Sequence, residues 1–173
     1  MPSQVTQTYP RITPSSLLDV AFQNTINSLY TGTYQASNPV VDSSGNVYVI
    51  RMSTSTAQAA VYKFSSAGTQ DATYLSNQGT AIGYTLNAAL CMTSSGKVMA
   101  TNYSGQSVNG SAVYGIYRLN TNGTKDSGFT LTGTGLTANS QPFVLAEVES
   151  SKILAGGQGW NTFNGSTIVN NIS

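Results

Sequence analysis

Short apolar and alternating runs of residues, separated by polar turns, organise the middle of the chain. Residues 85–92 form a mostly apolar run, and residues 97–103 return from a polar turn as a second β-type run. After a polar loop, residues 112–120 alternate as a strand does, and a tight turn leads to a fourth run at residues 126–132. The pattern predicts four short strands within about 55 residues.

The same pattern recurs along the chain. Residues 61–74 (VYKFSSAGTQDATY) and 116–129 (IYRLNTNGTKDSGF) carry the same kind of residue at eight positions, with a spacing of 55 residues. Residues 11–22 (RITPSSLLDVAF) add a partial copy, 52 residues before the next one. Residues 16–26 come closest to a helical period, but their acidic and aromatic positions fit the repeat instead, so we expect no helix.

These repeats predict an all-β fold of three four-stranded units of the β-propeller-blade type, each about 55 residues long. Residues 1–10 would form an N-terminal arm, and residues 11–173 would form the repeat domain. The repeats would end near Phe22, Tyr74 and Phe129, and the last repeat would be truncated. A closed ring usually needs about four to eight blades, so the ring would be incomplete unless chains associate or further repeats follow.

Two explanations compete for the truncated last repeat. In the first, the N-terminal strand completes the last blade, either in the same chain or in another chain. In the second, the sequence is the front part of a longer protein. An isolated monomer would expose strand edges in both cases, so we expect the chain to assemble into a homo-oligomer or a larger particle.

Charged residues are scarce, and eight of the thirteen occupy three repeat positions. They are Arg11, Lys63 and Arg118, then Asp19, Asp71 and Asp126, and finally Lys97 and Lys152. The favoured interpretation is structural: each Asp would accept backbone N–H groups after a turn glycine, such as Gly68 or Gly123, and fix the start of the fourth strand. The alternative is a calcium ligand or a catalytic acid, but the clustered oxygen ligands of a calcium loop are missing from the sequence.

Composition argues against several classes of function. A net charge of +1 provides no basic surface for nucleic acid. Histidine is absent, which removes the commonest general base and the usual hydrolytic triads. Glu147 and Glu149 would share one face of a strand, but neither has an identified partner. We therefore expect no enzymatic activity, no cofactor and no metal; the single cysteine, Cys91, fits a buried strand position.

Two further features concern location. No apolar run approaches the roughly 18 residues of a membrane-spanning helix, so we expect no membrane insertion. The first sixteen residues have neither the cationic nor the apolar region of a signal peptide, which predicts that this segment does not direct export.

A Gly-rich stretch near the end of the chain contains a candidate glycan site. Trp160, Asn161 and Asn164 could provide a stacking ring and polar contacts for a sugar, although packing of Trp160 within its blade is the favoured alternative. The NGS triplets at residues 109–111 and 164–166 and the NGT triplet at residues 122–124 match a glycosylation signal. They are better interpreted as hairpin turns, because Asn-Gly is the strongest short hairpin signal.

The residues SSGKVMA (94–100) and YRLNTNGTKDSGF (117–129) resemble the delta-sixty family of β-propeller repeats. Units of that family run from a Gly-Lys-Ile-Leu-like hairpin to an Arg-Leu-Asn-x-Asp-Gly-x-x-Asp-x-x-Phe ending. The segments at 43–50 and 62–74 fit more loosely, and residues 149–157 lack the turn glycine. The resemblance extends from about residue 11 to residue 166. It implies a propeller-type scaffold and no particular activity.

Abundant Ser, Thr, Asn, Gly and Tyr with little charge is typical of secreted adhesins and viral fibre proteins. Together with the expected assembly, this favours a non-enzymatic component of a virus particle, a bacteriophage tail or fibre protein used for assembly or host attachment. The alternative is a lectin-like propeller module outside the cell or at its surface. Expected partners are other virion proteins, copies of the chain itself, and cell-surface glycans.

Overall fold

A computed structural model gives the fold of most of the repeat region. The described residues are 19–28, 34–53, 58–79, 82–83, 88–101, 106–108, 111–113, 115–129, 141–149, 152–158, 162–163 and 166–167. Residues 1–18, which include the predicted N-terminal arm and Arg11, lie outside them. Completion of the last blade by the N-terminal strand therefore stays a prediction.

Strands dominate the described part of the chain. The helices are α1 (Val20–Ser28) and α2 (Ala72–Asn77). The strands are β1 (Tyr34–Ala36), β2 (Val40–Val41), β3 (Val47–Ser53), β4 (Gln58–Phe64), β5 (Ile82–Gly83), β6 (Leu90–Met92), β7 (Val98–Thr101), β8 (Gln106–Val108), β9 (Ser111–Val113), β10 (Ile116–Leu119), β11 (Gln141–Glu149), β12 (Lys152–Gln158), β13 (Thr162–Phe163) and β14 (Ser166–Thr167).

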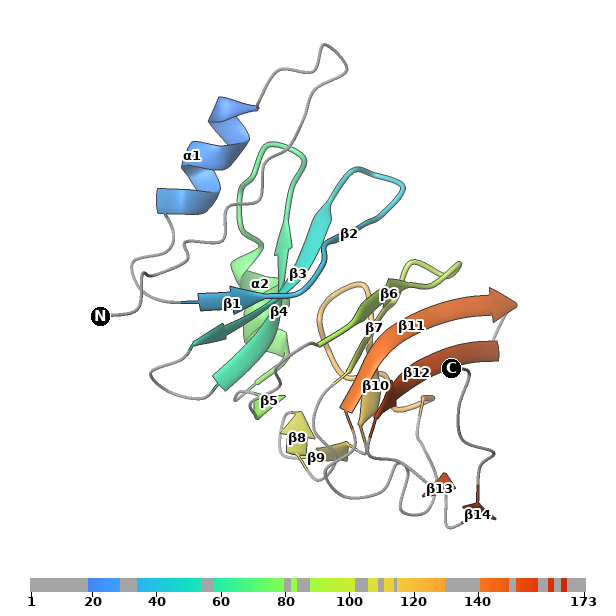
Figure 1. Cartoon of the computed structure of the whole chain (residues 1–173). Coiled ribbons are helices and arrows are strands. Elements are labelled where there is room, and N and C mark those ends of the chain that lie inside the picture. Colours follow the sequence, from blue (N-terminus) through green and yellow to red (C-terminus); the bar gives the residue numbers. More distant parts are fainter. Residues whose placement is uncertain are drawn as a thin grey trace.

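These strands form small antiparallel sheets (Figure 1). Sheet 1 has the order β1-β3-β4-β5, with β2 also paired to β3. Sheet 2 has the order β10-β7-β6, and sheet 3 consists of β11 and β12. The pairs β8-β9 and β13-β14 are separate hairpins. The all-β class is confirmed, and within the described residues the sheets form an incomplete propeller without a closed ring.

Equivalent positions of successive sequence repeats pair in the same way in successive sheets. Val47 pairs with Phe64 in sheet 1, and the corresponding Val98 pairs with Leu119 in sheet 2. Sheets 2 and 3 agree in the same way, because the pairing of Met92 with Val98 recurs 55 residues later in the pairing of Glu147 with Ile153. The sheets are therefore copies of one structural unit.

A glycine with positive φ completes each of four turns in sheets 1 and 2. They are Gly45 (φ 79°), Gly68 (φ 85°), Gly96 (φ 75°) and Gly123 (φ 89°). Each glycine N–H donates to the carbonyl oxygen three residues earlier, at 2.9 to 3.0 Å. Only glycine adopts this left-handed backbone without strain, which explains its place in the repeat. Sheet 3 has Ser151 at the equivalent sequence position, and its register shifts between Glu147 and Glu149.

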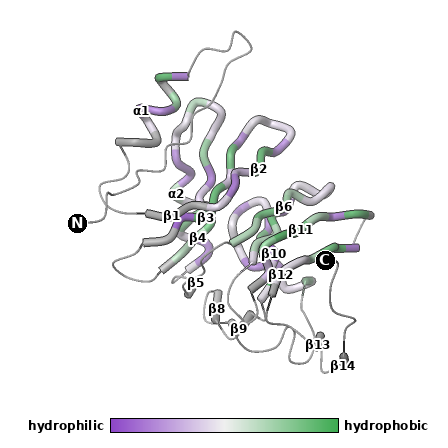
Figure 2. Tube along the Cα trace, in the orientation of Figure 1, coloured by the Kyte–Doolittle hydropathy of each residue, from purple (hydrophilic) through white to green (hydrophobic). Residues whose placement is uncertain are grey.

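The main core lies between sheets 1 and 2. Tyr48, Ile50 and Val61 of sheet 1 pack with Val98 and Leu119 of sheet 2, and all five are at most 3% exposed. Figure 2 shows hydrophobic positions concentrated along strands such as β6 and β11, with hydrophilic positions at many turns. The alternation of strand residues thus buries one face of each sheet against its neighbour.

Two further cores extend this stacking on either side. On the far face of sheet 1, Val49 and Phe64 bury Phe22 of α1. On the far face of sheet 2, Met99 and Leu145 form the centre of a cluster that joins sheets 2 and 3. Cys91 is half-buried at the edge of that cluster, so it lies on a strand that packs, as predicted, but is not fully buried.

The predicted fourth strand is wrong after Asp19 and Asp71, whereas residues 130–132 of the run predicted after Asp126 lie outside the described residues. Helix α2 follows Asp71, a turn follows Asp126 as far as Phe129, and helix α1 follows Asp19. Asp71 caps α2, since its side chain accepts the N–H of Tyr74. Helix α2 was missed because Tyr74 is the buried residue of its six residues, and one buried position cannot show a helical period. The expectation of no helix at residues 16–26 is also wrong, because α1 overlaps this segment.

The Asn-Gly pairs of the two NGS triplets fall between paired strands. Val108 pairs with Ser111, and Phe163 pairs with Ser166, which leaves two residues for each hairpin loop. The hairpin interpretation of the two NGS triplets is therefore confirmed. The run predicted as one strand at residues 112–120 is divided into β9 and β10.

Candidate functional site

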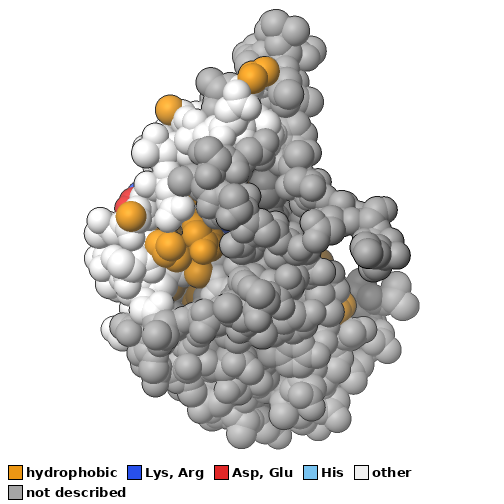
Figure 3. Space-filling view, turned by 90° about the vertical axis from the view of Figure 1, so that its left-hand side faces the viewer, with side chains coloured by type: hydrophobic (Ala, Val, Ile, Leu, Met, Phe, Trp, Pro, Cys, Tyr) orange, Lys and Arg blue, Asp and Glu red, His pale blue; other side chains and the backbone are white. Residues whose placement is uncertain are grey.

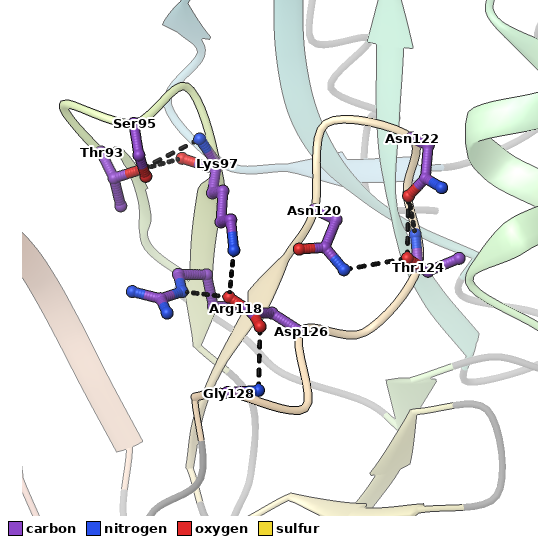
Figure 4. Close-up of polar contacts among 9 residues, drawn as sticks. All are labelled: Thr93, Ser95, Lys97, Arg118, Asn120, Asn122, Thr124, Asp126 and Gly128. Carbon is purple, nitrogen blue, oxygen red and sulfur yellow. Dashed lines mark hydrogen bonds and ion pairs between the residues drawn. The ribbon is translucent and has the colours of Figure 1, made fainter.

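A group of three charged side chains is formed by Lys97, Arg118 and Asp126 (Figure 4). Lys97 precedes β7, Arg118 lies on β10, and Asp126 follows the turn after β10. The pairing of β7 with β10 places the two cations on either side of the carboxylate. Asp126 Oδ2 accepts Lys97 Nζ and Arg118 Nε, each at 2.7 Å, and the Asp126 side chain is only 8% exposed. We call these three residues the charge cluster.

The second carboxylate oxygen of Asp126 accepts a hydrogen bond from the backbone. Its Oδ1 accepts the N–H of Gly128 at 2.9 Å, while the Asp126 N–H donates to the Arg118 carbonyl oxygen at 2.8 Å. The Arg118 guanidinium lies 4.9 Å from the ring centroid of Phe129, a cation–π contact. The charge cluster therefore holds β7, β10 and the following turn together.

The surroundings of Asp126 favour its ionised form. Desolvation by burial raises the pKa of Asp126, but hydrogen bonds from Lys97, Arg118 and the Gly128 N–H, with the positive charge of Arg118, outweigh it. The pKa of Asp126 consequently lies below the ordinary carboxyl value. A carboxylate held in this way is a poor general base, since its proton affinity is low and both oxygens already accept hydrogen bonds.

Sheet 1 contains a looser version of the same arrangement. Lys63 Nζ lies 3.4 Å from Asp71 Oδ2, and Asp71 Oδ1 accepts the Tyr74 N–H at 2.9 Å. Lys63 Nζ also lies 5.7 Å from the Tyr74 ring centroid. The position of Lys97 is held here by Asn46, so the second cation is replaced by an amide. Asp71 and Lys63 form a more exposed pair than the charge cluster.

Asp19 shows the feature common to all three repeat acids. Its Oδ1 accepts the N–H of Phe22 at 2.9 Å, at the start of α1. Within the described residues, no group of three or more His, Cys, Asp or Glu is arranged to hold a metal ion. The contacts of these acids are those of turn and helix-cap residues rather than of a reaction centre.

The two repeat glycines, Gly68 and Gly123, serve a related purpose. A Cβ at Gly123 would collide with the carbonyl oxygen of Tyr74, and a Cβ at Gly68 would lie 3.3 Å from the carbonyl oxygen of Phe22. The aromatic residue of the acid-capped helix in one repeat thus packs against the glycine turn of the next repeat. The structure brings together the acid, aromatic and glycine positions of successive repeats.

The candidate glycan residues Trp160, Asn161 and Asn164 lie outside the described residues. The glycan site therefore stays a prediction. Strands β13 and β14 flank Asn164 in the sequence, and β12 ends shortly before Trp160.

Glu147 has a role that sequence reasoning missed. Its Oε2 accepts the N–H of Ser94 at 2.5 Å, which links β11 to the β6-β7 turn. The irregular register between Glu147 and Glu149 also removes the regular spacing that would place both carboxylates on one strand face. No local sequence pattern shows this hydrogen bond, because it joins residues 53 positions apart in the chain.

Comparison with known proteins supports a propeller repeat. Residues 93–129 match the family model described as "Domain of unknown function (DUF5122) beta-propeller". This segment begins at the β6-β7 turn and contains β7, β10 and the whole charge cluster. No curated protein and no solved structure matches the chain. In the part of the chain that the structure describes, no helix is long and apolar enough to span a membrane.

Proposed function

We propose that this chain is a non-enzymatic structural component of a virus particle, a bacteriophage tail or fibre protein. In this proposal its repeats, which resemble the delta-sixty type, form a scaffold for assembly or for attachment to the host. The protein would be located in the virion, among other virion proteins and copies of itself.

The observation that carries this proposal is that the charged residues of the repeats make structural contacts. The repeat acids bind backbone N–H groups, and the buried Asp126 is saturated by Lys97, Arg118 and Gly128. Sheets 1, 2 and 3 stack through apolar faces, as an extensible scaffold requires. Low charge and abundant Ser, Thr, Asn, Gly and Tyr add the composition of fibre proteins.

The test is the location of the native protein. Virus particles would be purified on a density gradient from lysates of the cells that naturally produce the chain, and then analysed by quantitative mass spectrometry. We expect the chain to band with the particles at a constant ratio to the other particle proteins. Recovery of the chain only in particle-free fractions would reject the viral role.

A glycan array distinguishes the lectin alternative. Binding to a defined glycan that is lost on Trp160→Ala, without association with particles, would replace the structural role with a lectin role.

A further inference from the structure

The sheets in the stack have two different faces. In sheet 1, Tyr48 and Ile50 pack toward sheet 2, whereas Val49 packs toward α1. In sheet 2, Val98 packs toward sheet 1, whereas Met99 packs toward sheet 3. Each sheet thus presents a leading face to the preceding element and a trailing face to the following sheet.

The trailing face of sheet 3 is exposed. Its leading-face residues Leu145 and Ile153 belong to the cluster shared with sheet 2. On the other side, Val144 is 56% exposed and Leu154 is 49% exposed, and Ala146 pairs with Leu154 across the two strands. These three residues define the outer face of sheet 3.

The repeat shows what the outer face of sheet 3 corresponds to. Leu154, Ala146 and Val144 lie 55 residues after Met99, Cys91 and Ala89, respectively. In sheet 2 those three positions pack in the cluster with Leu145 of sheet 3, and Met99 is fully buried. The outer face of sheet 3 therefore corresponds to the face of sheet 2 that packs against sheet 3.

We propose that the outer face of sheet 3 binds the leading face of sheet 1 in a second copy of the chain. That leading face has the matching positions: Val47 corresponds to Val98 in the turn-aligned repeat, and Tyr62 lies 55 residues before Tyr117. Within the chain, Val98 and Tyr117 of sheet 2 pack against sheet 1. Val47 and Tyr62 remain only half-buried beside Phe22.

Helix α1 does not exclude this contact, because α2 occupies an equivalent place between sheets 1 and 2. Tyr74 of α2 lies against Gly123 as Phe22 of α1 lies against Gly68. Tyr74 belongs to the same core as the two packed sheets, so a helix at that position is part of a sheet-to-sheet interface. Figure 3 shows hydrophobic side chains gathered on part of the surface on the left-hand side of Figure 1.

The contact is head-to-tail, since different faces of the two copies meet. Such an interface builds a ring where the rotation closes and a filament where it does not. The inference deepens the assembly part of the proposed function and rests on it, but it requires no virus particle.

The test uses the purified full chain and two substitutions on the outer face of sheet 3, Val144→Lys and Leu154→Lys. Light scattering after size-exclusion chromatography should show assemblies for the unmodified chain. Each substitution should weaken association at least about tenfold and shift the mass toward that of one chain, since a lysine would be buried in the contact. The matched control is Thr73→Lys, because Thr73 is exposed and lies on α2, away from the outer face of sheet 3 and from the leading face of sheet 1.

Mixing complementary variants tests the head-to-tail geometry. Val47→Lys alters the leading face of sheet 1, and Tyr62→Gln replaces it if circular dichroism shows that Val47→Lys is unfolded. A chain with Leu154→Lys and a chain with Val47→Lys should each be monomeric, while their mixture should form a dimer through the two intact faces. Failure to restore a dimer would overturn the head-to-tail contact.

The remaining outcomes separate this inference from the proposed function. If Leu154→Lys assembles as the unmodified chain does, the outer face of sheet 3 is not the contact, and the assembly proposal stands with another surface. If the unmodified chain is monomeric at every concentration, the contact and the self-assembly proposal both fail. Association with virus particles is then decided by the particle analysis alone.

Discussion

Asp126 and Asp71 occupy the same repeat position but differ in their surroundings. Asp126 binds two cations at 2.7 Å and has an 8% exposed side chain, whereas Asp71 binds one cation at 3.4 Å and is 37% exposed. Hydrogen bonds to a buried charged group contribute more than those of an exposed pair, because water competes less. The two residues therefore provide a matched comparison within one molecule.

We expect Asp126→Asn to lower the free energy of unfolding by about 2–3 kcal/mol, because it leaves Lys97 and Arg118 without their carboxylate. Asp71→Asn should change it by less than about 1 kcal/mol, since asparagine also caps helices and the lost ion pair is half exposed. Urea denaturation followed by circular dichroism measures both. Equal losses for the two variants would show that the second cation and the burial contribute nothing.

The pKa of Asp126 also predicts a dependence of stability on pH. The folded-state pKa lies below the ordinary value of 3.8, so the ionised carboxylate stabilises the fold at any pH above that value. This contribution is lost as the pH falls below 3.8 and through the lower folded-state pKa. Unfolding free energies measured between pH 2 and pH 6 should fall more steeply in the unmodified chain than in Asp126→Asn. Parallel curves would contradict the assignment.

At the scale of elements, the glycine turns of sheets 1 and 2 have the same backbone but different neighbours. A Cβ at Gly96 would meet only Thr121 Cγ2 at 3.8 Å, whereas a Cβ at Gly123 would collide with the backbone of Tyr74. Both glycines have positive φ, so substitution strains both turns alike. The difference between them measures how closely α2 approaches the turn of sheet 2.

Gly96→Ala should therefore cost about 1–2 kcal/mol, the usual penalty for a left-handed residue other than glycine. Gly123→Ala should cost at least about 2 kcal/mol more, because the turn and α2 must move apart and loosen Tyr74 in the core. Thermal unfolding of the two variants compares these costs. If the two variants unfold at the same temperature, α2 does not pack against the turn as described.

The sequence predicted the elements whose chemistry is local. Gly45 and Gly96 identify hairpin turns because the turn itself requires a left-handed residue, and Asn109-Gly110 identifies a hairpin for a similar reason. The contact between Lys97 and Asp126 spans 29 residues and depends on the pairing of β7 with β10, so no local pattern shows it. The exposure of Leu154 was also out of reach, because it depends on which face of sheet 3 packs against sheet 2.

At the scale of the whole molecule, the stack of sheets has a directional order. The trailing face of sheet 3 leaves Leu154 and Val144 exposed, and the leading face of sheet 1 is covered in part by α1. Stability should then depend on chain concentration, because association stabilises the folded state by mass action. A monomeric protein has no such dependence.

We expect the melting temperature of the unmodified chain to rise by about 2–4 °C for a tenfold increase in concentration, as association through one face implies. Leu154→Lys should melt at one temperature across the same range. Differential scanning calorimetry at several concentrations makes the comparison, with Thr73→Lys as the control. A constant melting temperature for the unmodified chain would argue against self-association.

Hydrogen bonds at the turn end join neighbouring units: Asn77 Nδ2 donates to the Asn122 carbonyl oxygen at 2.8 Å, and the Ser94 N–H donates to Glu147. The apolar side chains between the sheets tolerate small sliding, whereas these directional contacts do not. The turn end would thus act as a pivot while the opposite end opens or closes slightly. The stacked sheets would then respond to a mechanical load by small changes in the angles between them, without breaking a strand.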